Sequence, residues 1–149
     1  MTPWRPPQNI RAKVIGLAWR GDLLLAMEVR DDAGRLKGLR PLGGSIAFGE
    51  TRDEALIREF REELGCGVTR TGPWSVFENI FRHEGALGHE IVFAADLDLH
   101  DAALYGRETI AFREDDGTPC LARWVRPDAL DEGMALFPDG LAAALMARP

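Results

Sequence analysis

Hydrophobic residues along this chain are grouped in short runs, and most of these runs predict β-strands. Two apolar, β-capable runs at 12–19 and 23–29 are separated by Arg20-Gly21-Asp22, an arrangement that is typical of a hairpin. Polar, Gly-containing sequence predicts a loop over 30–38, and 98–117 is expected to be a second, longer loop. The remaining strands are expected at 39–42, 74–81, 89–97 and 120–126.

Two helices are predicted, and the stronger prediction covers residues 52–64. Thr51 followed by Glu54 forms a capping box, and Gly65 stands where the end of a helix favours a left-handed residue. Apolar residues recur at helical spacing and therefore share one face: Ile57, Phe60 and Leu64. A second apolar helix is expected at 141–147, after Pro138-Asp139-Gly140.

The order of these elements predicts an α+β fold. The helices are too few and too far apart for a series of β–α–β units, whereas several hairpins with two helices favour a layered domain with a mixed sheet. No repeat and no linker divides the sequence, so we expect a single domain over 1–149. Residues 1–9 contain three prolines and are expected to form a flexible or strand-leading arm.

The formal net charge of −6 argues against a nucleic-acid polymer as the partner of this protein. It leaves open a phosphorylated small molecule, because a bound metal ion can supply positive charge locally. Cys66 and Cys120 make neither a disulfide framework nor a metal quartet, and they predict reduced core residues. Because no secretory signal and no run of membrane-spanning length is present, we expect a cytoplasmic protein without a membrane partner.

Three carboxylates are concentrated on the predicted helix 52–64. Glu59, Glu62 and Glu63 are spaced i, i+3 and i+4, which places them on one face, away from the apolar face. Like charges at such spacings destabilise an isolated helix by about 0.2–0.5 kcal/mol per pair. A hard divalent cation with oxygen ligands would offset this repulsion. The alternative is a solvated acidic helix face, as acidic runs usually are.

The positions around these carboxylates form a longer pattern. It runs from Gly44, through five residues to Glu50 and seven more to Arg58, and ends at Cys66. This segment, 44–66, resembles the signature box of the Nudix hydrolases at each defined polar and glycine position. The departures are Phe60 and Cys66, where the family prefers aliphatic residues. RPLGGSIAFGE, FENIF, GHEIVF and FPDGL resemble a bacterial branch of the family that is broad in substrate.

The resemblance implies a Nudix-type α/β/α sandwich, with a mixed sheet between helices. It implies hydrolysis of a pyrophosphate bond in a nucleoside diphosphate linked to another moiety, with Mg²⁺ or substituting Mn²⁺ and an attacking water. Nucleotides, nucleotide-sugars, ADP-ribose and oxidised nucleoside triphosphates all remain candidate substrates. The alternative function is a Nudix-fold nucleotide-binding or regulatory module without significant catalysis. Family members are frequently dimers, so a homodimer could form.

The resemblance also assigns roles to residues of the box. Glu59 and Glu63 would be the principal metal ligands, while Glu62 would bind metal directly or through water, or act as a base. The carbonyl of Gly44 would complete the metal shell. Arg58 would pair with Glu50 and hold the carboxylates in place, although Arg58 could equally make only helix pairs.

An additional acidic ligand often comes from outside the box in this family. We rank Glu90 first and Glu108 second, with Glu78 and Glu114 as further candidates. His83 and His89 lack a third nitrogen or sulfur ligand nearby, so they make a poor zinc pattern.

Candidates for substrate contacts are aromatic and basic. Arg40 is the phosphate-binding candidate that we carry forward, with Arg82 and Arg107 as alternatives. Trp74, Phe77 and Phe81 could stack on a base, but core packing is the favoured interpretation for these aromatic residues.

Overall fold

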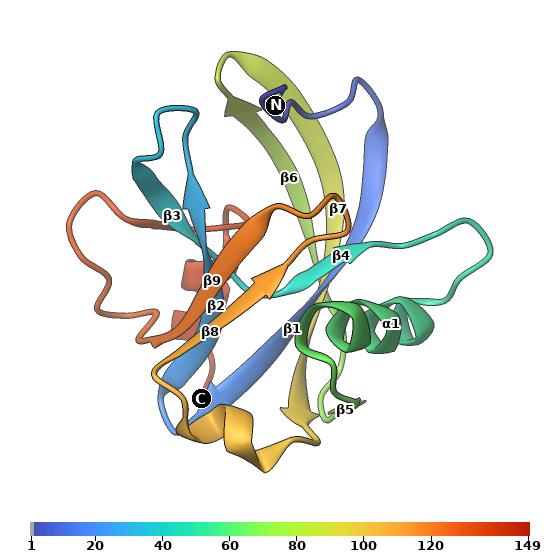
Figure 1. The fold of residues 1–149 in the computed structure, drawn as a ribbon, viewed down its shortest axis with the longest axis vertical. Coiled ribbons are helices and arrows are strands. Elements are labelled where there is room, and N and C mark those ends of the chain that lie inside the picture. Colours follow the sequence, from blue (N-terminus) through green and yellow to red (C-terminus); the bar gives the residue numbers. More distant parts are fainter. Residues whose placement is uncertain (1) are drawn as a thin grey trace.

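The computed structural model describes residues 2–149, which form one mixed β-sheet flanked by helices (Figure 1). Its elements follow in chain order: β1 (Ile10–Arg20), β2 (Leu23–Arg30), β3 (Leu36–Arg40), β4 (Gly43–Ser45), α1 (Arg52–Leu64), β5 (Val68–Arg70), β6 (Ser75–His83), β7 (Ala86–Leu99), a 3-10 helix (Ala102–Gly106), β8 (Thr109–Arg113), β9 (Pro119–Val125), β10 (Ala135–Leu136) and α2 (Leu141–Met146).

Strand β1 lies at the centre of the sheet and joins its two halves. It runs parallel to β7 from Ile10 to Ala18, while β4 pairs with it antiparallel over Lys13–Ile15. Its last residues, Trp19 and Arg20, pair antiparallel with β2. One half of the sheet therefore contains β4, β5, β6 and β7, and the other contains β2, β3, β8, β9 and β10.

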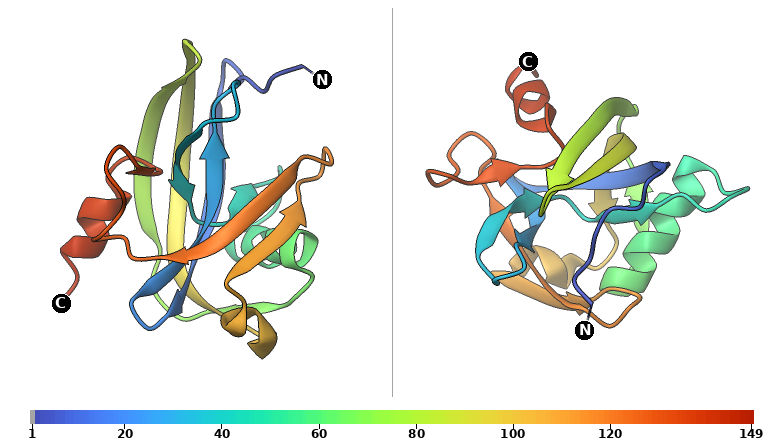
Figure 2. Two further views of the ribbon diagram at one scale, coloured as in Figure 1. Left: turned by 60° about the vertical axis from the view of Figure 1, so that its left-hand side comes forward. Right: turned by 90° about the horizontal axis from the view of Figure 1, so that it is seen from above.

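Alternate residues of β1 face two different hydrophobic clusters. Val14 and Ala18 pack in the cluster that includes Phe60 of α1. Ile15 and Leu17 pack in the cluster that includes Leu141 of α2. The two helices consequently lie on opposite sides of the sheet (Figure 2), as side-chain alternation along a strand requires. The predicted α+β class and its α/β/α sandwich are confirmed.

The helix predicted at 52–64 has those bounds in the structure. Thr51 accepts a hydrogen bond from the Glu54 backbone N–H at 3.1 Å, and the Glu54 side chain accepts one from the Thr51 backbone N–H at 3.1 Å. Gly65 ends the helix in the left-handed region with φ 69°. The capping signals in the sequence thus determine both ends of the element that carries the acidic face.

The loop predicted over 98–117 is wrong in its middle part. This stretch contains the end of β7, a 3-10 helix and β8, and Ile110 and Phe112 are buried on one side of β8. The alternation of Thr109–Arg113 was visible in the sequence, but it is short and lies between polar segments.

The arm 2–9 contains no helix or strand and leads directly into β1, which begins at Ile10. Trp4 lies 5.5 Å from the ring of His83, measured between ring centroids. Within residues 2–149, no helix is both long and apolar enough to cross a membrane.

Candidate active site

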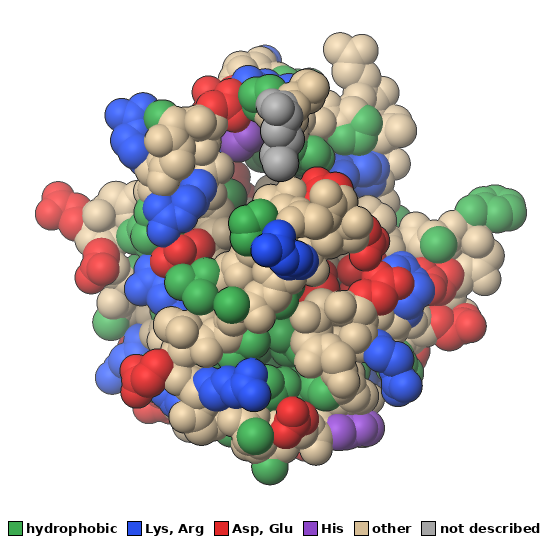
Figure 3. Space-filling model, viewed as in Figure 1, with side chains coloured by type: hydrophobic (Ala, Val, Ile, Leu, Met, Phe, Trp, Pro, Cys, Tyr) green, Lys and Arg blue, Asp and Glu red, His purple; other side chains and the backbone are tan. Residues whose placement is uncertain are grey.

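The box brings strand β4 against the acidic face of α1. Gly44 pairs with Val14 of β1, and a Cβ atom added at Gly44 would lie 2.3 Å from the carboxyl carbon of Glu59. Because no real Cβ can approach so closely, only glycine allows the β4 backbone and this carboxylate to come together. Acidic side chains gather on the side of the molecule that carries α1, at the right in Figure 3.

Arg58 is the centre of a network of ion pairs. Its Nε and Nη2 donate to the two carboxylate oxygens of Glu50 at 2.7 and 2.9 Å, which is a bidentate arrangement. Its Nη1 donates to Glu59 at 2.9 Å and to Glu62 at 3.3 Å, and its Nη2 also donates to the carbonyl of Ser45 at 3.0 Å. The structure thus brings together the predicted partners Arg58 and Glu50 and connects them to Glu59.

Glu50 supports this network from the loop before α1. It accepts a hydrogen bond from the backbone N–H of Ala47 at 3.0 Å. The hydrogen bonds from Arg58 and this backbone donor lower the pKa of Glu50 to about 2. Glu50 is therefore ionised and holds Arg58 in one orientation.

Glu59 and Glu63 are short of positive charge, in contrast to Glu50. Burial and the neighbouring Glu59 raise the pKa of Glu63 to about 8, against a weaker opposing effect of Arg40. Burial also raises the pKa of Glu59, although Arg58 opposes that shift. The Oε2 atom of Glu63 is buried and has no hydrogen-bond partner among residues 2–149. Glu62 is more open, with 40% of its side chain exposed.

A further carboxylate approaches the box from the end of β8. Glu114 lies close enough to raise the pKa of Glu63, and its Oε1 is 3.8 Å from Nη2 of Arg40. Asp115, the next residue, contributes to the raised pKa of Glu59. Of the four acidic candidates outside the box, Glu114 is therefore the one that the structure brings to it.

Glu90, the first-ranked candidate for the additional metal ligand, is paired with basic side chains in the structure. Its carboxylate accepts a hydrogen bond from Arg11 at 2.6 Å and one from Asn79 at 3.3 Å, and Nζ of Lys13 is 3.9 Å away. Arg11 pairs with Glu90 across the parallel strands β1 and β7. The carboxylate is thus neutralised by basic side chains that were not recognised in the sequence.

The signal that could have revealed this cluster is the single lysine in the apolar run 12–19. Burial, with the nearby Arg40 charge, lowers the pKa of Lys13 to about 8. A lysine that is buried within a strand usually has an acidic partner, and Glu90 is that partner here. The other two candidates, Glu78 and Glu108, are exposed.

One histidine, His83, lies among potential metal ligands and beside a basic side chain. His83 is buried and its Nδ1 lies 2.9 Å from Nζ of Lys37. Asp32, His83 and Glu84 bring potential ligand atoms within 4.8 Å of one another. The carboxylate of Asp32 is already paired with Arg5 at 2.6 Å. Arg5 and Lys37 together balance the negative charges of Asp32 and Glu84, which leaves no excess of negative charge for a metal.

The aromatic candidates mostly pack in the protein interior. Phe77 and Trp74 are half-buried against the two hydrophobic clusters, as the favoured interpretation expected. Trp74 also lies under the guanidinium groups of Arg52 and Arg70, each 5.3 Å from its ring. Arg82 and Arg107 are exposed, whereas Arg40 lies near Glu63 of the box and near Glu114.

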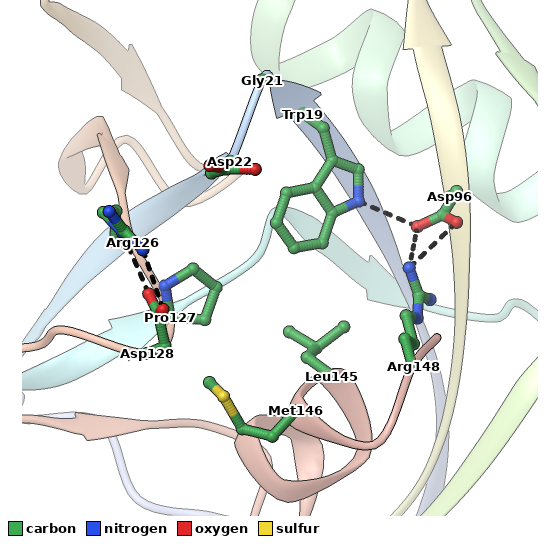
Figure 4. Close-up of a pocket in the computed structure, with 10 residues that line it drawn as sticks. All are labelled: Trp19, Gly21, Asp22, Asp96, Arg126, Pro127, Asp128, Leu145, Met146 and Arg148. Atoms are coloured by element: carbon green, nitrogen blue, oxygen red, sulfur yellow. Dashed lines mark hydrogen bonds and ion pairs between the residues drawn. The ribbon is translucent and has the colours of Figure 1, made fainter.

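A cavity of about 560 Å³ lies between the β1–β2 turn and α2, away from the box (Figure 4). Both of its arginines are already paired, since Arg148 contacts Asp96 at 3.0 Å and Arg126 contacts Asp128 at 2.9 Å, and a further carboxylate, Asp22, also lines it. Among its lining residues the cavity therefore has no unpaired positive charge for a phosphorylated ligand, and the box remains the better candidate site.

Comparison with known proteins identifies the family of this chain. The family model described as the NUDIX domain matches residues 9–145. No curated protein sequence matches the chain significantly.

Several solved structures share the fold at low sequence identity. The E. coli ORF135 protein is 21% identical, with a TM-score of 0.55 over 93% of this chain and 89% of its own. The MutT NUDIX hydrolase from Burkholderia pseudomallei is 20% identical, with a TM-score of 0.53 over 86% and 92% of the two chains. A NUDIX-family hydrolase from Clostridium perfringens is 15% identical, with a TM-score of 0.51 over 93% and 94%.

The family match covers almost the whole chain. The fold of the chain and its box at 44–66 agree with that match. Hydrolases of this family generally use divalent metals. The chain therefore belongs to the NUDIX domain family, and it is a Nudix-type pyrophosphohydrolase.

Proposed function

We propose that this protein hydrolyses a pyrophosphate bond in a nucleoside diphosphate linked to another moiety, and that Mg²⁺ is its metal. One observation carries the proposal: Glu59 is buried and Glu63 half-buried beside it, with too little positive charge around them, and Glu63 Oε2 has no partner within residues 2–149. Such an arrangement costs stability unless a cation joins it.

The donor set fits a hard divalent cation. Glu59, Glu63 and Glu62 offer carboxylate oxygens, and Gly44 offers a backbone carbonyl from a strand that comes directly against Glu59. Oxygen-only sites of this kind suit Mg²⁺, with Mn²⁺ as a substitute, rather than zinc or copper. A bound Mg²⁺ supplies charge that stabilises the pyrophosphate and lowers the pKa of water.

The protein groups around this site have distinct tasks. Glu50 holds Arg58, and Arg58 in turn orients Glu59, so the network fixes a metal ligand indirectly. Arg40 is placed to bind a phosphate group, because it lies beside both Glu63 and Glu114 without a short ion pair. Glu114 replaces Glu90 as the proposed additional carboxylate, and Glu62 is exposed enough to contact water.

The substrate is proposed only at the level of a class: a nucleotide, a nucleotide-sugar, ADP-ribose or an oxidised nucleoside triphosphate. The negative net charge supports a small phosphorylated ligand over a nucleic-acid polymer. The free cysteines Cys66 and Cys120 support a cytoplasmic location.

A panel of these pyrophosphates, assayed separately with Mg²⁺ and Mn²⁺, tests the proposal. We expect hydrolysis of at least one class, with both products identified, and its loss in Glu59→Gln and Glu63→Gln. Glu132→Gln is a matched control, because Glu132 lies in an exposed turn before β10. Tight nucleotide binding without turnover of any panel member would favour the non-catalytic module instead.

A further inference from the structure

Strand β6 is an edge strand with unused backbone groups. Along its whole length, from Ser75 to His83, it pairs with β7, and no other strand within residues 2–149 pairs with it. Edge strands present a row of donors and acceptors to which another strand can add. The free edge of β6 is therefore a candidate interaction surface.

The turn that joins β6 to β7 shows which residues have their backbone groups at the free edge. Glu84 and Gly85 have φ values of 51° and 79°, and they connect the paired residues His83 and Ala86. In such a two-residue hairpin the closing pair exchanges both hydrogen bonds, and every second residue repeats this. The N–H and C=O groups of the alternate residues Val76, Glu78, Ile80 and Arg82 consequently point away from β7.

The side chains of these residues belong to an exposed, largely apolar face of the sheet. Val76 and Ile80 are 56% and 54% exposed. Ile80 lies in one row with His89 and Ile10, and Leu87 lies opposite Arg82 in the next row. Ile10 and Leu87 are 64% and 52% exposed. The free edge of β6 thus continues into an uncovered hydrophobic surface.

We propose that β6 of one copy pairs antiparallel with β6 of a second copy, with the two-fold axis at Ile80. This register places Ile80 opposite Ile80 in a hydrogen-bonded pair. It also places Glu78 of each copy opposite Arg82 of the other, so that two opposite-charge pairs flank the centre. Glu78 and Arg82 are exposed and lie outside the residues to which the proposed active site assigns a role.

Charge complementarity selects this register among those that the backbone allows. A two-fold axis at Glu78 would oppose two carboxylates, and one at Arg82 would oppose two guanidinium groups. An axis at Asn79 would leave both charges opposite apolar residues. Only the axis at Ile80 pairs opposite charges on both sides, and cross-strand pairs of opposite charge stabilise a sheet while like charges destabilise it.

Charge reversal at the edge tests this dimer by sedimentation velocity over a range of protein concentrations. We expect a dimer for the wild-type chain, and dissociation constants raised about tenfold or more in Glu78→Arg and in Arg82→Glu, where like charges face each other. An equimolar mixture of the two variants should form a mixed dimer, detected by native mass spectrometry, because opposite charges then meet at both contacts.

Two more variants separate the edge from general effects. Ile80→Pro removes a donor that points to the free edge, so it should give a monomer with an unchanged far-ultraviolet spectrum. Glu132→Arg makes the same charge change in a distant turn and should remain dimeric. A wild-type monomer at all concentrations, a dimer that persists in Glu78→Arg, or single variants that do not recombine would each overturn the proposal.

Discussion

Two groups of buried carboxylates in this protein have opposite electrostatic surroundings. On α1, Glu59 contacts the guanidinium group of Arg58, while Glu63 has only the weaker influence of Arg40, and the pKa of each carboxyl is raised. On β7, Glu90 is surrounded by Arg11 and Lys13, with Asn79 as a further donor. All three glutamates are at least half-buried, so burial alone does not distinguish them.

The difference lies in whether the protein itself supplies the compensating charge. Glu90 is neutralised by two basic side chains and needs no ion, so it serves to hold β1, β6 and β7 together. The α1 carboxylates leave a deficit that an external cation can fill. A buried acidic residue thus indicates a metal site only after the nearby cations have been counted.

The largest expected effect comes from removing one charge on α1. Glu59→Gln and Glu63→Gln should each lower kcat by roughly 10²–10³-fold, because the metal loses a ligand. The fold should persist, and the thermal midpoint should not fall, since the change removes repulsion between buried carboxylates. Steady-state kinetics with differential scanning calorimetry measure both effects. Near-normal kcat in both variants would exclude these residues from catalysis.

The same substitution at Glu90 should have the opposite profile. Glu90→Gln leaves Arg11 and Lys13 without a compensating charge, so the free energy of unfolding should fall by about 2–3 kcal/mol. Turnover of the remaining folded protein should stay within a few-fold of wild type. Urea titration measures the loss, with exposed Glu78→Gln expected within about 0.5 kcal/mol of wild type. A Glu90→Gln protein that is inactive but fully stable would contradict the structural role of Glu90.

Arg58 is proposed to orient the metal ligand Glu59 without binding the metal itself. Arg58→Lys keeps the charge but cannot make the bidentate pair with Glu50. We expect metal affinity to fall about 10–100-fold, with a smaller change in overall stability. Calorimetric Mg²⁺ titration checks this expectation, and unchanged affinity would show that Arg58 does not position the metal ligand.

A pH dependence of stability is also expected in the metal-free protein. The pKa of Glu63 is raised from 4.5 to about 8 on folding, so the folded state retains a proton that the unfolded state has released between these values. Stability should therefore decrease as pH rises through this window, with a slope of at most about 1.4 kcal/mol per pH unit. Urea titrations of wild type and Glu63→Gln should differ in slope, and parallel curves would contradict the raised pKa.

How far the sequence predicted the structure depends on the range of the interactions involved. Helix α1 was predicted with its observed bounds because Thr51, Glu54 and Gly65 act locally. The pairing of Glu90 with Arg11 joins residues on β7 and β1, and no spacing rule links two strands before their register is known. Strand β8 was missed because its alternation is short, and with it the approach of Glu114 to the box.

The central claim is that the acidic face of α1, and not the carboxylate on β7, holds the divalent ion. Isothermal titration of Mg²⁺ into wild-type, Glu63→Gln and Glu90→Gln proteins tests this claim most directly. We predict equal affinities for wild type and Glu90→Gln, and an affinity at least about tenfold weaker for Glu63→Gln. Binding that is unchanged in Glu63→Gln but lost in Glu90→Gln would contradict the account.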